Sequence, residues 1–316
     1  MQGRMVRPVR VAGLCLLIVV ACMGGACPKL PQGTVRTTIE HGGRTRTYLV
    51  YVPESYTPGT PTPVVLALHP FSLTGVDMQR KSGFDVVADR EGFLVCYPDA
   101  VSRVWNGDPT DETQGPGEDD PGYIAAVLDQ LAIDYSLDAN KVFVAGMSNG
   151  ALMTYRLACE LSDRITAIAG VACTLPAGFG SFCAPVKPLP VMMMMGVADP
   201  FFPWEGGTVN QGPFMQVQYQ SAADSVAHWI GINNAGGPPQ VEELPDTDPM
   251  DGTRVFRETH AANPGGHPVV FYRIEGGGHT WPGGYTSVLE QLVSVGNTSR
   301  DINAAEAIWA FFASVP

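Results

Sequence analysis

The feature that most constrains the fold is the pentapeptide Gly146 to Gly150, which reads Gly-Met-Ser-Asn-Gly. It follows directly on Val142 to Ala145, an apolar segment with the character of a buried strand, and a predicted helix begins where it ends. A Gly-x-Ser-x-Gly sequence between strand and helix predicts a sharp, strained turn that projects the serine hydroxyl away from the sheet. The glycines are needed because a side chain at either place would meet the neighbouring strand and helix. Ser148 is therefore the candidate nucleophile.

The rest of the chain alternates between predicted strands and predicted helices. Two early segments, Thr34 to Glu40 and Thr45 to Val52, alternate apolar and polar residues and predict an antiparallel pair. The apolar run Pro63 to His69 is typical of a strand buried on both faces. Further strands are expected at 93–97, 141–145, 165–171, 190–196 and 269–274, and helices at 78–90, 123–134, 150–161, 222–232 and 302–312. The fold class is therefore α/β, with a mostly parallel central sheet and helices on both faces in a single domain.

Two long segments between these elements are rich in glycine or proline. The segment Asp99 to Pro121 leaves a strand at its carboxyl end, where open α/β sheets build their ligand sites. The segment Gly236 to Gly252 is rich in acidic residues, and we expect a solvated loop. Four consecutive methionines, Met192 to Met195, lie between apolar Val191 and Gly196, so they are expected to fill a buried strand.

Composition and charge exclude several classes of function. The chain has 316 residues, of which 45% are hydrophobic and 16% charged, so it can bury a sizeable core. Its formal net charge of -12 argues against a nucleic-acid partner, because binding to phosphates requires a basic surface. The sequence has no Cys-x-x-Cys pair and no histidine-rich cluster, so no metal site is predicted.

The first residues predict export from the cytoplasm. Three arginines, at positions 4, 7 and 10, precede the apolar run Val11 to Ala21, as in a secretory signal peptide. This run is too short to span a bilayer. The tetrapeptide Val19 to Cys22 resembles the site at which bacterial lipoproteins are cleaved and lipidated, so Cys22 is a candidate membrane tether. Cleavage after Ala26, which would release a soluble protein, is the alternative.

The predicted organisation is a signal peptide at 1–21, a linker at 22–33 and one catalytic domain at 34–316. The mature protein is then secreted or lipid-anchored to the bacterial cell envelope, and disulfides can form there. Cys96 lies inside a predicted strand, where a buried thiol is expected. The other cysteines of the mature chain are Cys27, Cys159, Cys173 and Cys183. One bridge is expected among Cys159, Cys173 and Cys183, but the spacing leaves the pairing open.

A serine nucleophile needs a base to take its proton and an acidic residue to orient that base. His279 follows the predicted strand 269–274 through three glycines, which allow the imidazole to be placed above the sheet. Asp199 follows the methionine-rich strand, and Pro200 fixes a turn there. The resulting order of serine, acid and histidine is the order of α/β-hydrolase triads, which require no metal or organic cofactor. Two glutamates are alternatives for the acid: Glu205 and Glu275.

Acyl transfer also requires hydrogen-bond donors for the negative charge that forms on the carbonyl oxygen. One candidate is the backbone N–H of Asn149, directly after the serine, and the other is expected in the loop that follows His69. Pro70 has no N–H, so the second donor is Phe71 or, as the alternative, Ser72. Because His69 precedes the serine, we interpret it as a residue that shapes this loop and not as the base.

Aromatic residues near these positions are candidates for the wall of a substrate cleft, because they offer large apolar contact at fixed geometry. Trp281 is close to the candidate base, and Trp105 lies in the long loop after the strand 93–97. Phe71 and Trp204 are further candidates. For each of them ordinary core packing is the alternative.

Seven short motifs follow one another along the chain, namely Leu68-His69, Tyr97 to Ala100, Trp105-Asn106, Asp119 to Ile124, Val144 to Gly150, Ala198 to Pro200 and Gly277 to Pro282. With these motifs the chain resembles the secreted polyhydroxybutyrate depolymerases and feruloyl esterases, which are relatives of carbohydrate esterase family one. The resemblance covers nearly the whole mature chain. It implies the α/β-hydrolase fold, with Ser148 as nucleophile, Asp199 as acid and His279 as base.

Two departures from the family pattern are visible. Pro70 stands where the family usually has glycine, which concerns the geometry of the oxyanion hole. The segment Met195 to Asp199 stands where the family often reads His-Gly-Thr-Ala-Asp, and this change keeps the carboxylate.

The resemblance implies a serine esterase that hydrolyses carboxylic esters through an acyl-enzyme. Its substrates would be hydroxyalkanoate oligomers or polyesters, or feruloyl or acetyl esters. Two alternatives stay open: a serine peptidase on the same scaffold, and a non-catalytic cell-surface binding protein that kept the fold. Turnover of p-nitrophenyl acetate without cleavage of peptide anilides excludes the peptidase, and a missing reaction with a fluorophosphonate probe would favour the binding protein.

Overall fold

The computed structural model of the protein describes residues 31–109, 117–210, 216–286 and 295–316. The predicted signal peptide at 1–21, the candidate lipidation site Cys22, Cys27 and most of the linker lie outside the described residues. The first described strand begins at Thr34. Within the four described ranges, no helix combines the length and the apolar character needed to cross a bilayer.

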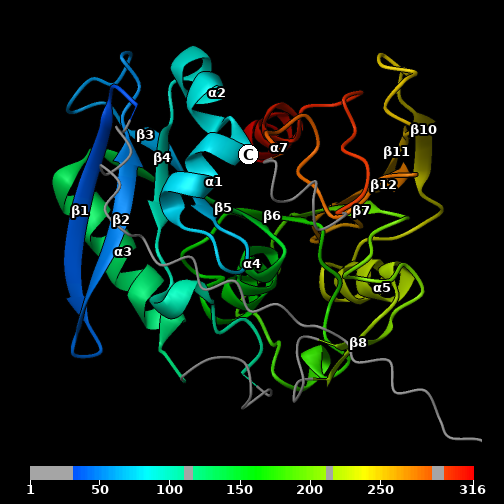
Figure 1. Ribbon diagram of the computed structural model, residues 1–316. Coiled ribbons are helices and arrows are strands. Elements are labelled where there is room, and N and C mark those ends of the chain that lie inside the picture. Colours follow the sequence, from blue (N-terminus) through cyan, green and yellow to red (C-terminus); the bar gives the residue numbers. More distant parts are fainter. Residues whose placement is uncertain (1–30, 110–116, 211–215, 287–294) are drawn as a thin grey trace, which may run out of the picture.

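One large sheet runs through the centre of the described chain. Its strands are β1 (Thr34–His41), β2 (Arg44–Tyr51), β3 (Thr62–Leu68), β4 (Leu94–Pro98), β5 (Leu137–Met147), β6 (Ala167–Val171), β7 (Val191–Gly196), β10 (Gln240–Glu243), β11 (Arg254–His260) and β12 (Val269–Glu275). They lie in the order β1-β2-β4-β3-β5-β6-β7-β12-β11-β10 (Figure 1). The strands from β4 to β12 in this order are parallel, and both edges are antiparallel. The loops after β3, β5, β7 and β12 therefore leave the same edge of the sheet.

Helices cover both faces of this sheet, as predicted. They are α1 (Gly75–Ser82), α2 (Phe84–Glu91), α3 (Asp120–Asp134), α4 (Asn149–Glu160), α5 (Ala222–Ile232) and α7 (Ala304–Ala313), with short 3-10 turns at Val101–Arg103 and Phe179–Ser181. Figure 1 shows α3, α4 and α5 on one face and α1, α2 and α7 on the other.

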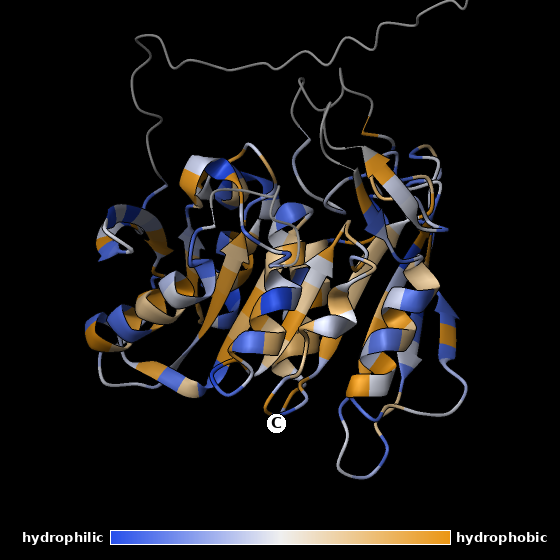
Figure 2. Cartoon of the chain, turned by 90° about the horizontal axis from the view of Figure 1, so that it is seen from below, coloured by the Kyte–Doolittle hydropathy of each residue, from blue (hydrophilic) through white to orange (hydrophobic). Residues whose placement is uncertain are grey.

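The two faces of the sheet have separate hydrophobic cores, and β3 contributes to both. Val64 and Leu66 pack into the core that holds α3, α4 and α5, while Val65 and Ala67 pack into the core that holds α1, α2 and α7. Figure 2 shows the central strands mostly in the colours of hydrophobic residues. This burial on both faces explains why the central strands read as continuous apolar runs and not as alternating patterns.

The single helix predicted at 78–90 is in fact two helices, α1 and α2. Gly83 separates them because its backbone is left-handed, with φ of 73°, so it ends α1 and precedes α2. The start of α1 is fixed by a capping box, in which the Thr74 hydroxyl accepts from the Asp77 N–H and the Asp77 carboxylate accepts from the Thr74 N–H. The two helices follow one another directly at Gly83, so the sequence suggests one helix where the structure has two.

The acidic segment 236–252 is predicted to be only a solvated loop, but it contains the edge strand β10. The next strand, β11, is not predicted from the sequence either. All four residues of β10 are exposed, and only Val255 and His260 of β11 are buried. These strands form because β12 offers an unpaired edge, not because of their own apolar pattern. A separate two-stranded ribbon of β8 (Gly207–Asn210) and β9 (Gln216–Tyr219) was also not predicted.

A buried ion pair anchors the long loop that follows β4. Arg46 of β2 donates to Asp120 Oδ1 at 2.7 Å, and its guanidinium lies 3.8 Å from the ring centre of Tyr123. The other oxygen of Asp120 accepts from the Asn106 N–H at 2.8 Å, and the Asn106 carbonyl accepts from Arg156 of α4 at 2.6 Å. This network holds the middle of the loop against α4, the helix that begins at the candidate nucleophile.

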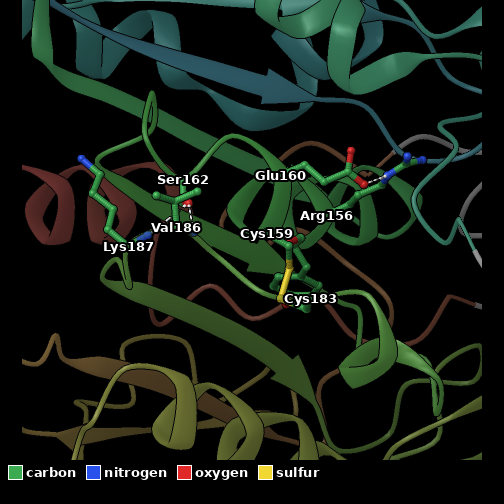
Figure 3. The surroundings of a disulfide bond; sticks show 8 residues. Arg156, Cys159, Glu160, Ser162, Cys183, Val186 and Lys187 are labelled. Atoms are coloured by element: carbon green, nitrogen blue, oxygen red, sulfur yellow. Dashed lines mark hydrogen bonds and ion pairs between the residues drawn. A yellow bond between two sulfur atoms is a disulfide. The ribbon is translucent and has the colours of Figure 1, made fainter.

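A disulfide joins Cys159, near the end of α4, to Cys183 in the loop before β7 (Figure 3). One bridge among Cys159, Cys173 and Cys183 was predicted, and the structure decides the pair. The same loop is also held by Ser162, whose hydroxyl accepts from the Val186 N–H at 2.9 Å. Cys173 and Cys96 are free and buried, as predicted for Cys96, and burial raises the pKa of both thiols well above the usual range.

Replacing both Cys159 and Cys183 by alanine is expected to lower the free energy of unfolding by about 3 kcal/mol, because the bridge closes a loop of 24 residues in the unfolded chain. Urea denaturation of the oxidised wild type and of the double variant measures this difference. Reduction of the wild type is the matched control and should reproduce the loss. Equal denaturation midpoints would show that the bridge does not stabilise the fold.

Candidate active site

Ser148 lies on a strained turn between β5 and α4. Its backbone has φ of 56° and ψ of -122°, a region that residues with a side chain rarely adopt. Two backbone hydrogen bonds hold it there: its N–H donates to the Val171 carbonyl at 2.8 Å, and its carbonyl accepts from the Leu152 N–H at 3.0 Å. The predicted turn between strand and helix is therefore present, with its serine at the carboxyl edge of the sheet.

Close backbone packing explains both glycines of the pentapeptide. A Cβ on Gly146 would lie 2.2 Å from the carbonyl oxygen of Gly150. A Cβ on Gly150 would lie 2.3 Å from the carbonyl oxygen of Leu68, at the end of β3. Neither backbone oxygen can move aside without shifting a strand or a helix. The turn therefore requires glycine at both places.

Asp199 and His279 form the second part of the site. His279 Nδ1 lies 2.8 Å from Asp199 Oδ2, and the side chain of Asp199 is completely buried. The other oxygen, Oδ1, accepts from the N–H groups of Phe201 and Phe202 at 2.8 and 2.9 Å. Because the carboxylate accepts, His279 Nδ1 carries the hydrogen of this bond, and its Nε2 is left as the hydrogen-bond acceptor.

The loop after β12 presents His279 at the same edge of the sheet. The His279 N–H donates to the Val295 carbonyl at 2.6 Å, and the Gly278 N–H donates to the Asn297 carbonyl at 2.9 Å. The imidazole stacks on Phe202, with ring centres 5.6 Å apart. Of the two glutamates considered as alternatives for the acid, Glu205 is exposed and Glu275 pairs with Arg273, whereas Asp199 is the carboxylate that pairs with His279.

The site thus brings the three predicted residues to one edge, but one contact is not formed. Ser148 follows β5, Asp199 follows β7 and His279 follows β12, and these strands run parallel within the order β5-β6-β7-β12. Among the described residues, no hydrogen bond joins the Ser148 hydroxyl to the His279 ring. Their catalytic cooperation remains a proposal.

Two backbone N–H groups were expected to serve as oxyanion donors. Asn149 is the first residue of α4, so its N–H has no partner inside the helix. Of the two candidates after Pro70, the N–H of Ser72 is engaged, since it donates to the Arg103 carbonyl at 3.0 Å. The N–H of Phe71 has no acceptor in the described chain. The geometry therefore favours Phe71 over Ser72.

The two tryptophans predicted to line the substrate cleft are buried, which corrects that expectation. Trp105 has no exposed surface, and its indole N–H donates to the His69 carbonyl at 3.0 Å. Trp281 is 1% exposed, and its indole N–H donates to the Ser82 carbonyl at 3.2 Å. Core packing, the alternative considered for each, describes both. Exposure could not be predicted because it depends on how the loops fold back over the sheet.

Two phenylalanines are exposed at the site instead. Phe71, on the candidate oxyanion loop, is 62% exposed, and Phe201, on the turn that carries Asp199, is 39% exposed. The ring of Phe201 meets the His279 imidazole edge-on, with centres 5.1 Å apart. Phe71 was among the predicted candidates, whereas Phe201 was missed. Its sequence signal is the Phe-Phe pair directly after Asp199-Pro200.

No group of three or more His, Cys, Asp or Glu side chains with an arrangement suited to a metal ion occurs in the part of the chain that the structure describes.

The mostly parallel sheet, its helices on both faces and the serine turn after β5 define an α/β-hydrolase. A solved acetyl xylan esterase from Aspergillus awamori shares this fold, with a TM-score of 0.54 and 19% identity over 78% of this chain and 94% of that chain. The chain belongs to the esterase PHB depolymerase family, whose sequence model matches residues 46–203. The predicted fold and family are thereby confirmed.

Relatives support the same class of protein. "Putative esterase NocK" of Nocardia uniformis subsp. tsuyamanensis is 31% identical over 291 residues, which are 88% of this chain and 82% of that protein. A bifunctional acetylxylan esterase/xylanase of Neocallimastix patriciarum is 30% identical over 157 residues, 50% of this chain and 22% of that protein. This chain is thus similar to esterases, although it matches only about a fifth of the bifunctional enzyme.

Proposed function

We propose that this protein is a serine esterase that hydrolyses carboxylic esters through an acyl-enzyme, with Ser148, Asp199 and His279 as its triad. The observation that carries the proposal is the 2.8 Å pair of Asp199 and His279 at the sheet edge that also holds the strained Ser148. Strained backbone conformations cluster at active sites, and a histidine oriented by a buried carboxylate is the arrangement of a catalytic base. Membership of an esterase family supports the same chemistry.

In the proposed mechanism, His279 Nε2 takes the proton of the Ser148 hydroxyl while Ser148 Oγ attacks the ester carbonyl carbon. The N–H groups of Asn149 and Phe71 hold the oxyanion of the tetrahedral intermediate. The intermediate collapses by breaking the bond to the alcohol oxygen, which receives the proton from His279. Water then attacks the acyl-enzyme by the same route and releases the acid. Asp199 keeps the imidazole oriented throughout.

The proposed substrates are aryl or short acyl esters, including feruloyl and acetyl esters and soluble hydroxyalkanoate oligomers. The exposed rings of Phe71 and Phe201 support this class, because they provide apolar surface beside the reacting groups. Several relatives bear the names acetylxylan esterase or feruloyl esterase.

We also propose that the protein is exported by the predicted signal peptide at 1–21, with Cys22 as its lipid anchor. The disulfide between Cys159 and Cys183 supports an oxidising compartment.

A substrate panel with an active-site probe tests this function. We expect the wild-type protein to hydrolyse p-nitrophenyl acetate and methyl ferulate, to leave peptide anilides intact, and to react once per chain with a fluorophosphonate. Cleavage of the anilides at a comparable rate would favour the peptidase. No turnover and no labelling would favour the non-catalytic binding protein.

A further inference from the structure

The loop that follows β4 contains a turn with two adjacent strained residues, Ser102 and Arg103. Their φ angles are 52° and 62°, in the left-handed region that residues with a side chain seldom occupy. Ser72, in the loop after β3, is also left-handed, with φ of 64°, and its N–H donates to the Arg103 carbonyl at 3.0 Å. Strained backbone of this kind clusters at active sites and ligand clamps, which makes the turn a candidate for a functional role.

Backbone contacts place Arg103 between the two loops of the candidate oxyanion hole. On one side, the Arg103 carbonyl holds Ser72, the residue next to Phe71. On the other side, the chain continues to Trp105, whose N–H and carbonyl both bind the side-chain amide of Asn149, at 2.7 and 3.0 Å. Phe71 and Asn149 carry the proposed oxyanion donors. The backbone of Arg103 is therefore tied to both sides of the place where the reacting carbonyl would bind.

The side chain of Arg103 is exposed, and its guanidinium makes no hydrogen bond or ion pair with any residue that the structure describes. Most arginines of the described ranges do pair with a carboxylate, as Arg46 does with Asp120 and Arg156 with Glu160. In a chain with a net charge of -12, an unpaired cation beside the reacting groups is unusual and remains available to an anionic group of a ligand.

The carboxylates of nearby segments do not neutralise this cation. Asp77 and Asp99 accept instead from backbone N–H groups at the start of α1, at 2.9 and 2.6 Å. The field of Arg103 also reaches the end of β3. Burial is the main cause that lowers the pKa of the His69 imidazole there, and the charge of Arg103 lowers it further, while Asp99 and Asp77 raise it. The charge of Arg103 thus acts at the sheet edge that holds the site.

We propose that Arg103 binds a carboxylate group of the substrate, so that esters with a free acid end, such as oligomers of hydroxyalkanoates, are preferred over neutral esters. The proposal rests on the proposed esterase function and narrows its substrate class. In such an oligomer the terminal carboxylate lies only a few bonds from the last ester carbonyl. An arginine beside the oxyanion donors can bind it while that carbonyl is attacked, and the planar guanidinium suits a carboxylate because it can form two parallel hydrogen bonds.

A pair of substrates that differ in charge but hardly in shape tests this role. One is the linear dimer of 3-hydroxybutyrate, and the other is the same dimer with its acid end converted to a primary amide. Arg103→Gln is expected to lower kcat/KM for the acid dimer about tenfold, mainly through KM, as for the loss of one charge-assisted hydrogen bond near the surface. Its kcat/KM for the amide should change less than twofold, which also shows that the fold and the triad are intact.

Two further variants separate a local contact from a general effect of charge. Arg36→Gln is the matched control, because Arg36 is exposed on the edge strand β1 and its loss changes the net charge equally. This variant should hydrolyse both dimers at the wild-type rate. Arg103→Lys keeps the positive charge but not the planar donor pair, and we expect it to stay within about threefold of the wild-type kcat/KM for the acid dimer.

Several results would overturn the proposal. Equal losses for the acid and the amide in Arg103→Gln would assign the residue to loop packing, and an equal loss in Arg36→Gln would assign the effect to net charge. A wild type that hydrolyses p-nitrophenyl acetate but not the acid dimer refutes the substrate class and leaves the esterase function standing. A wild type that hydrolyses none of these esters refutes the esterase function itself, and this is seen before any variant is made.

Discussion

Ser148→Ala is expected to lower kcat for p-nitrophenyl acetate by about 10⁵-fold or more and to abolish reaction with a fluorophosphonate. Without the hydroxyl there is no nucleophile, so no acyl-enzyme can form, and only binding and the oxyanion donors remain to help direct attack by water. The fold should survive, because the Ser148 side chain makes no hydrogen bond within the described chain. Steady-state kinetics and labelling followed by mass spectrometry measure both losses.

Ser181→Ala is the matched control for this experiment. Ser181 is exposed, and its hydroxyl donates only to the nearby Gly178 carbonyl, so this variant should keep full activity and full labelling. Labelling of the Ser148→Ala protein at the wild-type rate would place the nucleophile elsewhere in the chain. That result would end the triad proposal while leaving the fold and the family unchanged.

Gly146→Ala is expected to lower the free energy of unfolding by about 4 kcal/mol or more, which is a large part of the roughly 5 to 15 kcal/mol typical of a folded domain. The new Cβ would lie 2.2 Å from the Gly150 carbonyl oxygen and 2.6 Å from the Thr154 hydroxyl. The first of these atoms is backbone at the start of α4, so relief of the clash requires α4 to move away from β5. Soluble yield and urea denaturation measure the effect.

Gly231→Ala makes the same chemical change in open space. Gly231 lies in α5, and a Cβ there would meet no atom within 4 Å. Alanine is the better helix former, so this variant should gain up to about 1 kcal/mol of stability. Equal stability of the two variants would mean that the turn around Ser148 is looser than the structure describes.

Much of the fold could be predicted because its central strands are buried on both faces. Burial of that kind leaves continuous apolar runs such as Val142 to Ala145, which can be recognised without tertiary information. The edges were less predictable. Residues of β10 are all exposed, and those of β11 mostly half-buried, so their strand character comes from pairing with β12 and not from their own pattern.

The candidate site divides in the same way. Its turn, its histidine and its acid could be located because each follows a recognisable strand, and chain order then suggests their roles. The walls of the site could not be located. Trp105 and Trp281 satisfy their indole N–H groups with backbone carbonyls beneath the surface, whereas Phe71 and Phe201 remain exposed. Aromatic residues look alike in sequence, and only the path of the loops separates them.

The sequence by itself determined the strand–turn–helix around Ser148, the parallel centre of the sheet and the family, because these depend on short-range patterns of apolar residues and glycines. Only the tertiary structure decided which cysteines pair, which carboxylate meets His279 and which N–H after Pro70 is free. Those outcomes depend on contacts between segments far apart in the chain, such as the 2.8 Å contact that joins Asp199 to His279. Local sequence carries no record of such distances, since they are set when β5, β7 and β12 align in one sheet.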